Sequence, residues 1–270
     1  MAQRYVRVTD TQGQTYYGLL EPNRNVRVLD APPWLGGQPT DLVLEVENYT
    51  LLAPCAPSKI VAVGKNYADH AAEMGTPVPK EPLLFLKPPT TVTAHGKPIY
   101  YPSQSEQVEY EGELAIVVGD RSRNCTPEQA PSKIWGYTIA NDVTARDLQR
   151  KDGQWTRAKG FDTFCPLGPW IVREVTVGAH LQTFINDEST PRQSVSTEQM
   201  VFNPQVLFAY ISQVMTLLPG DIILTGTPQG VGLLAIGDRV RVEIEGIGKL
   251  ENTVAAAGYS LPLVELILTP

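Results

Sequence analysis

The sequence VEYEGELAIVVG, residues 108–119, places Glu109, Glu111 and Glu113 at alternating positions just before the apolar run 114–118. Side chains alternate between the two faces of a strand, so the three carboxylates are predicted to point to the same side. At a spacing of about 6.6 Å, neighbouring carboxylates repel by about 2.5 kcal/mol at an effective dielectric of about 20. Either solvent covers this face, or a divalent cation (Mg2+, Mn2+ or Ca2+) offsets the repulsion.

The composition indicates a globular protein with a substantial core. The chain has 270 residues, 42% of them hydrophobic, and a net charge of −7. This acidic balance, without a Lys/Arg run, argues against nucleic acid as a partner. No apolar run approaches the roughly 20 residues of a membrane helix, and residues 1–17 lack the features of a signal or transit peptide. We therefore expect a cytoplasmic protein with no membrane association.

Proline and glycine divide the chain into short segments. The 23 prolines and 22 glycines separate strand-like pieces such as 4–10, 134–141 and 239–244, a pattern typical of a mainly β fold with some α. Residues 1–55 are predicted to form a small β-rich N-terminal domain, and a proline-containing linker leads to a catalytic domain over 59–270. The cysteines are far apart and are predicted to be buried free thiols: Cys55, Cys125 and Cys165.

Two helices are predicted. Residues 203–218 form the longer one, with Asn203 as N-cap and Pro204 at the first helical position. Its apolar residues follow helical spacing: Leu207, Ile211, Val214 and Leu218. A shorter helix is predicted over 66–74, ending at Gly75.

The short helix carries His70 and Glu73, which are neighbours on one helical face because they are three residues apart. The pair could share a proton with a bound water, although a plain surface contact explains the same spacing. The other histidines, His95 and His180, lie in turn-like segments without an acidic neighbour. His70 is therefore the candidate for acid–base chemistry.

A further group of charges follows the strand-like segment 137–140. Asp142 comes directly after it, where a third carboxylate could join Glu111 and Glu113. Arg146 and Lys159 follow, together with Gln149. These cations could form structural ion pairs or could bind an anionic substrate that also touches a metal ion.

The glycine-rich segment TGTPQGVG, residues 225–232, is neither a P-loop nor a dinucleotide fingerprint, since both required patterns are missing. Two interpretations remain for it. It could be a hairpin turn, or Thr227 and nearby backbone N–H groups could hold a carboxylate.

Six motifs, in this order, resemble the fumarylacetoacetate hydrolase family over residues 59–254: KNYADHAAEMG, LFLKPPT, EYEGELAIVVG, GYTIANDVTARDLQ, QWTRAKGFDTFCPLGPW and LTGTPQGVG. Residues 1–55 resemble the small N-terminal domain of many members. The resemblance implies a mixed β-sandwich roll, a homodimer, and one divalent metal held by Glu111, Glu113 and Asp142. Glu109 lies outside that ligand set.

The resemblance also implies roles for other residues. His70 and Glu73 are similar to a catalytic dyad on a lid that orders when ligand binds, and Lys159 to a lysine beside the metal. The candidates for contact with substrate, or for support around the metal, are Arg146, Gln149 and Thr227, together with Lys87, whose role the resemblance leaves open.

The chemistry follows from the open positions on the metal. Three carboxylates leave about three positions of an octahedral Mg2+ or Mn2+ free, and a small 2-oxo acid could fill two of them. The first prediction is hydrolytic C–C cleavage of acylpyruvate-type 1,3-diketo acids, or decarboxylation of oxaloacetate, through a metal-bound enolate. One alternative is 2-hydroxyhepta-2,4-diene-1,7-dioate isomerase-like or oxaloacetate tautomerase activity. Another is a catalytically inert small-molecule binding protein.

Overall fold

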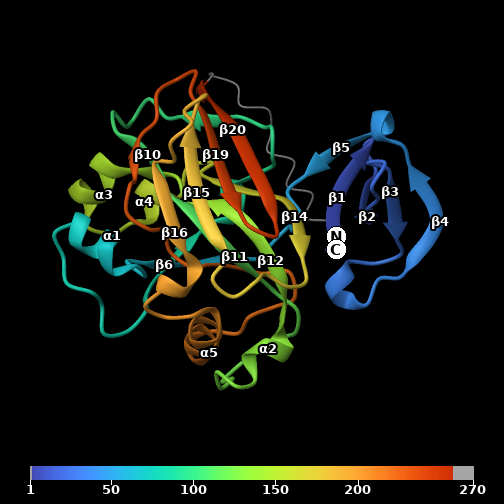
Figure 1. Cartoon of the computed structure of the whole chain (residues 1–270), viewed down its shortest axis with the longest axis horizontal. Coiled ribbons are helices and arrows are strands. Elements are labelled where there is room, and N and C mark those ends of the chain that lie inside the picture. The colour runs from blue at the N-terminus through green and yellow to red at the C-terminus, as the bar shows by residue number, and fades with distance from the viewer. Residues whose placement is uncertain (1, 258–270) are drawn as a thin grey trace.

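Residues 2–257, the part of the chain that the computed structural model describes, are built mainly from short strands (Figure 1). This confirms the predicted mainly β fold with some α. None of the helices in this part combines the length and apolar character needed to span a membrane.

The first five strands form an antiparallel unit with its own core. Val6, Val8, Val26, Val28 and Leu44 are buried together there. Figure 1 shows these strands beside the main body of the molecule. The strands are β1 (Arg4–Asp10), β2 (Thr15–Leu20), β3 (Val26–Leu29), β4 (Pro39–Leu44) and β5 (Tyr49–Leu52).

The unit is continuous with the rest of the molecule. Tyr5 of β1 pairs with Ile171 of β14, so one sheet runs through both parts, and the division into residues 1–55 and 59–270 stays a prediction. The connection is also not an exposed linker, because Ala53 and Cys55 are buried in the main core. All three cysteines are buried and free, as predicted.

A twelve-stranded sheet forms the centre of the fold, in the order β4-β3-β2-β1-β14-β12-β11-β17-β6-β7, with β5 on β1 and β8 on β14. Its strands outside the N-terminal unit are β6 (Ile60–Gly64), β7 (Leu83–Lys87), β8 (Val92–Thr93), β11 (Gly112–Val118), β12 (Ile134–Asn141), β14 (Cys165–Val172) and β17 (Ile222–Leu224).

The apolar run 114–118 lies in β11, where it is buried on both faces. Ala115 and Val117 pack into one core cluster, and Ile116 and Val118 into another. Strands covered on both faces have continuous apolar sequences rather than alternating ones. The covering helices on the second side are α2 (Ala130–Lys133) and α5 (Pro204–Val214) (Figure 1).

Two smaller sheets complete the fold. The five-stranded sheet contains β9 (Ile99–Tyr101), β15 (His180–Ile185), β16 (Gln193–Ser196), β19 (Arg239–Ile244) and β20 (Gly248–Ala256). The three-stranded sheet contains β10 (Val108–Tyr110), β13 (Thr144–Ala145) and β18 (Gly232–Leu233). The remaining helices are α1 (Ala68–Glu73), α3 (Arg146–Asp152) and α4 (Thr156–Lys159), with 3-10 turns at Pro33–Leu35, Val46–Asn48, Pro89–Thr91 and Thr197–Gln199.

The predicted long helix is confirmed at its start and wrong at its end. The Asn203 side chain accepts a hydrogen bond from the Val206 N–H, as an N-cap does. The helix ends at Val214, which is exposed, and Leu218 lies beyond it. The chain leaves the helix there because Leu217 forms a bridge with Ser122, which takes the backbone groups that a further turn would use.

One other local prediction is wrong, and one of the two open interpretations of segment 225–232 is excluded. His180 begins strand β15 rather than lying in a turn. The segment 225–232 is not a hairpin turn, since β17 before it and β18 at its end belong to different sheets.

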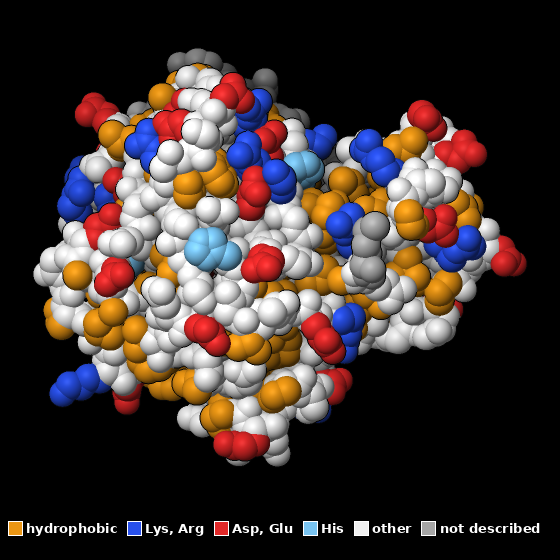
Figure 2. All heavy atoms as spheres, in the orientation of Figure 1, with side chains coloured by type: hydrophobic (Ala, Val, Ile, Leu, Met, Phe, Trp, Pro, Cys, Tyr) orange, Lys and Arg blue, Asp and Glu red, His pale blue; other side chains and the backbone are white. Residues whose placement is uncertain are grey.

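On the face shown in Figure 2, acidic and basic side chains are interspersed and neither gathers into one patch.

Candidate metal centre and its pocket

The acidic cluster forms where the chain passes from one sheet to another. Glu111 lies between β10 and β11, and Asp142 follows β12. The register pairs Gly112 with Asn141, which brings the two acidic residues side by side. The Asp142 N–H donates to the Glu111 carbonyl at 2.8 Å. Strand pairing therefore places a carboxylate from each of two strands at one sheet end.

Glu111, Glu113 and Asp142 can each offer a carboxylate oxygen such that all three atoms lie within 4.8 Å of one another. All three residues are buried, and Glu109 is buried too. Solvent therefore does not cover this face, and that interpretation of the alternating glutamates is wrong. Three clustered carboxylates are the donor set that hard divalent cations select.

Lysines pair with two of these carboxylates. The Lys159 ammonium donates to Glu111 Oε2 at 2.8 Å and to Asp142 Oδ2 at 2.5 Å. Lys87 Nζ donates to Asp142 Oδ1 at 2.6 Å. Lys87 lies behind Asp142 and is not among the residues that line the pocket, so it supports the carboxylate from the protein side.

Arg146 holds the other side of the cluster. Its guanidinium donates to Glu109 Oε2 at 2.7 Å and to Glu111 Oε1 at 2.5 Å. A third bond, at 2.7 Å, goes to Gln149 Oε1 from the same helix, α3. Glu109 is thus a buried partner of Arg146 rather than a solvent-facing group.

These contacts shift the pKa values of Glu111 and Glu113 in opposite directions. Burial alone would raise the pKa of Glu111, but Lys159 and Arg146 lower this pKa far below its usual range. The pKa of Glu113 is raised well above its usual range by burial and by the charges of Asp142 and Glu111. Burial disfavours the Lys159 ammonium, yet Asp142 and Glu111 outweigh it and raise the pKa of Lys159.

Glu113 is the carboxylate that tests the fit of a metal ion. Among the described residues it makes no ion pair, and its Oε2 accepts a hydrogen bond from the Gly226 N–H at 2.7 Å. A buried carboxylate without a cation is costly, and a divalent ion shared with Glu111 and Asp142 would supply the missing positive charge. The donor set therefore fits such an ion.

Helix α1 brings the predicted dyad to the same place. His70 Nδ1 lies 3.0 Å from Glu73 Oε2. Glu73 is held a second time, because its Oε1 accepts a hydrogen bond from the Gly230 N–H at 3.0 Å. Tyr110 donates its hydroxyl proton to the Gly230 carbonyl. The segment 225–232 thus holds carboxylates through backbone N–H groups, but they are the protein's own Glu113 and Glu73.

Thr227 lines the pocket, as a substrate contact would. Its hydroxyl donates to the Gly112 carbonyl at 2.9 Å and accepts from Gln193 Nε2 at 2.8 Å. In this arrangement its proton is already used. Thr227 would need to exchange that bond to donate to a substrate carboxylate.

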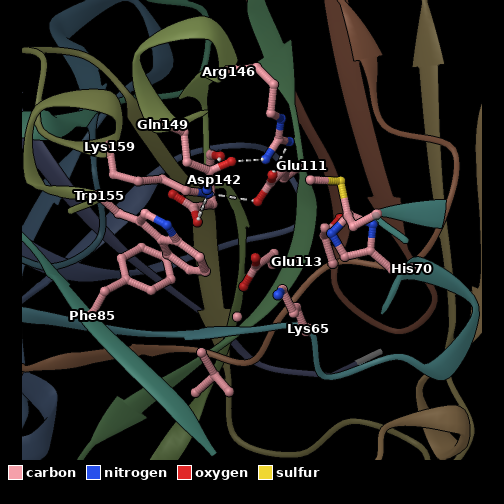
Figure 3. A pocket seen from close by; sticks show the side chains of 14 residues that line it. Lys65, His70, Phe85, Glu111, Glu113, Asp142, Arg146, Gln149, Trp155 and Lys159 are labelled. Carbon is pink, nitrogen blue, oxygen red and sulfur yellow. Dashed lines mark hydrogen bonds and ion pairs between the residues drawn. The ribbon is translucent and has the colours of Figure 1, made fainter. Parts of the chain in front are cut away.

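Figure 3 shows how the pocket is arranged: Lys159, Trp155 and Phe85 lie on one side of the acidic cluster and His70 lies on the other. The cavity is about 40 Å³, enough for only a few water molecules. Sequence reasoning gave no role to Lys65, Phe85 and Trp155, although each lies inside one of the quoted motifs. The residues lining the pocket are Val63, Gly64, Lys65, His70, Met74, Phe85, Glu111, Glu113, Asp142, Arg146, Gln149, Trp155, Lys159 and Thr227.

The mainly β fold and this buried acidic pocket define the class as a protein with a candidate divalent-metal site beside a histidine. The chain belongs to the fumarylacetoacetate hydrolase family, a family of enzymes: residues 59–255 match the family model described as fumarylacetoacetate (FAA) hydrolase, C-terminal. Residues 3–54 match the model described as Rv2993c-like, N-terminal.

Known proteins similar to this chain include three that bear on its function. Protein Rv2993c of Mycobacterium tuberculosis is 50% identical over 212 residues, covering 77% of this chain and 79% of that protein. Oxaloacetate tautomerase fahd2, mitochondrial, of Xenopus laevis is 43% identical over 226 residues, covering 78% of this chain and 70% of that protein. The solved structure of a 5-carboxymethyl-2-hydroxymuconate delta-isomerase from Mycobacterium smegmatis has a TM-score of 0.87 and 43% identity, covering 94% and 100%.

Proposed function

We propose that the protein is a divalent-metal-dependent enzyme that moves a proton on the carbon next to the oxo group of small 2-oxo acids. The expected reaction is tautomerisation of oxaloacetate or isomerisation of a related unsaturated acid. Two relatives, one named as a tautomerase and one as an isomerase, support proton transfer as the reaction. They favour it over hydrolysis and decarboxylation, which were the first prediction from the sequence.

The His70–Glu73 pair beside the three carboxylates is the observation that carries the proposal. In the tautomer that donates its Nδ1–H to Glu73, His70 has an unprotonated Nε2 that could take a proton from carbon. Nε2 makes no hydrogen bond to the described residues. His70 can then deliver this proton to oxygen, which completes tautomerisation, or to another carbon, which completes isomerisation.

Glu111, Glu113 and Asp142 would hold Mg2+ or Mn2+, with Ca2+ as a further candidate. Such an ion supplies Lewis-acid stabilisation of negative charge on oxygen. Lys159 and Arg146 keep Glu111 ionised and in place. The cavity is small, and His70 and Met74 of the α1 segment line it, so we expect α1 to shift when a substrate enters and to exclude water on its return.

Hydrolysis of acylpyruvates is the second candidate, because the same dyad could instead take a proton from water. A catalytically inert binding protein is disfavoured by the combination of the dyad with the acidic cluster.

The test follows the enol absorbance of oxaloacetate and the loss of an acylpyruvate, each with Mg2+ or Mn2+ and with EDTA. We expect protein-dependent, metal-dependent acceleration of the keto–enol conversion above the rate with metal alone. If neither reaction responds to the protein with metal, the inert binding protein is the better description.

A further inference from the structure

Lys65 lines the pocket but has no place in the site described above. It follows β6 directly, is half-buried, and borders the cavity together with Glu113 and His70. In the view of Figure 3 it lies below Glu113, whereas Arg146 and Lys159 lie above it.

The backbone at Lys65 is held in a conformation that lysine rarely adopts. Its φ is +59°, in the left-handed region. Residues in this region persist where the surroundings fix them, and they gather at binding sites. Here the next residue, Asn66, is the anchor: its side chain donates to the Phe202 and Thr225 carbonyls at 2.9 and 2.7 Å and accepts from the Phe202 N–H.

The residue before Lys65 is fixed as well. A Cβ on Gly64 would come within 2.8 Å of the Trp155 ring, so the chain lies close against the pocket wall. With both neighbours held, the direction of the Lys65 Cα–Cβ bond follows from the fold.

Lys65 differs from the other cations at the pocket in its partners. Lys159 and Arg146 both form ion pairs with buried carboxylates. Within residues 2–257, Lys65 makes no ion pair or side-chain hydrogen bond. A half-buried lysine that lines a pocket and has no partner among the described residues is available to an anionic group of a ligand.

Under the proposed function, the carboxylate next to the oxo group would bind the metal ion held by Glu111, Glu113 and Asp142. Lys65 is then the lysine at the pocket that a second carboxylate, at the other end of the ligand, would meet. Resting on the proposed function, we propose that Lys65 is a specificity-determining residue that binds the distal carboxylate of dicarboxylic 2-oxo acids.

The test compares two five-carbon acids that differ at one end: 2-oxoglutarate, with a terminal carboxylate, and 2-oxopentanoate, with a terminal methyl. Binding of each to the Mn2+-loaded protein is measured by calorimetry for wild type, Lys65→Met and Lys65→Arg. We expect the wild type to prefer the dicarboxylate, Lys65→Met to lower that preference about tenfold or more, and Lys65→Arg to keep most of it. Lys80→Met, an exposed lysine away from the pocket, is the matched control.

Mn2+ affinity without either acid is measured for the same variants and should not change. An unchanged preference in Lys65→Met overturns the proposal, as does failure of both acids to bind the wild type. A changed Mn2+ affinity with an unchanged preference also overturns it and makes Lys65 a counter-ion of Glu113. Neither acid carries a 4-oxo group, so neither can be cleaved during the binding measurement. Turnover of oxaloacetate is assayed separately. A failure of the Lys65 proposal is therefore distinguishable from a failure of the proposed function.

Discussion

Glu113 is the residue at which the charge of the site is least balanced. Its neighbours Glu111 and Asp142 each have lysine partners, whereas within residues 2–257 Glu113 has only the Gly226 N–H as partner. The folded protein therefore raises the pKa of Glu113 and disfavours its ionised form. A raised carboxylate pKa stabilises the fold below the unfolded value of about 4.5, and this contribution is lost as pH rises through the folded pKa.

Glu113→Gln is therefore expected to stabilise the metal-free protein at neutral pH. Each unit of pKa shift corresponds to about 1.4 kcal/mol, so the melting temperature in EDTA should rise by a few degrees. Added Mn2+ should stabilise the wild type and not this variant, because a ligand is gone. Thermal melts from pH 4 to 8 measure both effects, with the exposed Glu128→Gln as control. A Glu113→Gln protein that still gains stability from Mn2+ would show that Glu113 is not a ligand.

The sequence predicted which residues gather at the site better than it predicted their partners. Alternating glutamates and a carboxylate after a strand are local patterns that left solvent and a metal ion as alternatives, and the family resemblance was needed to predict the cluster. Lys87 reaches Asp142 across 55 residues, and Gly230 reaches Glu73 across 157. Such pairings depend on strand register and loop path, for which a single sequence holds no local signal.

At the scale of elements, α1 is the helix on which the proposed chemistry depends. It was predicted over 66–74 and spans Ala68–Glu73, because Asn66 is taken up by its bonds to Phe202 and Thr225. A helix of this length has little stability of its own in water. Its start is held by the bridge between Tyr67 and Met200, and its end by the hydrogen bond from the Gly230 N–H to Glu73.

His70→Ala and Glu73→Gln are expected to slow oxaloacetate tautomerisation and acylpyruvate hydrolysis about a hundredfold or more, the usual effect of losing a general base. Decarboxylation should fall less, since it depends mainly on the metal and the cations that hold the substrate. Rate measurements on all three reactions decide this, with the exposed Asp69→Asn of the same helix as control. Equal losses in all three would assign the dyad to a shared enolisation step, and wild-type rates would make it a plain surface pair.

In helix α5 the local sequence pattern predicts the start of the helix but not its end. The capping residue and proline at its start were legible in the sequence, and both act as predicted. Its end depends on Leu217, which pairs with Ser122 in a distant segment. Helix starts are encoded by nearby side chains, whereas this end was set by tertiary pairing.

At the scale of the whole molecule, the two ends of the central sheet differ. At one end, β4 carries Pro39 and Asp41, which discourage pairing with another strand. At the other end, β7 has the sequence LLFLK, with Leu83 and Leu86 exposed at 40% and 50%. An apolar edge strand without an outward charge favours contact with a second chain.

We therefore expect a homodimer that covers β7. Light scattering should return about twice the single-chain mass of 29.6 kDa, and Leu86→Lys should shift the equilibrium toward monomer by placing a charge in the interface. Leu42→Lys on β4, also an exposed leucine at a sheet edge, is the matched control and should leave the mass unchanged. A wild-type mass near one chain at every concentration would contradict the dimer. A Leu86→Lys protein that stays dimeric would move the interface away from β7, because an unpaired lysine ammonium cannot be buried there without a large desolvation cost.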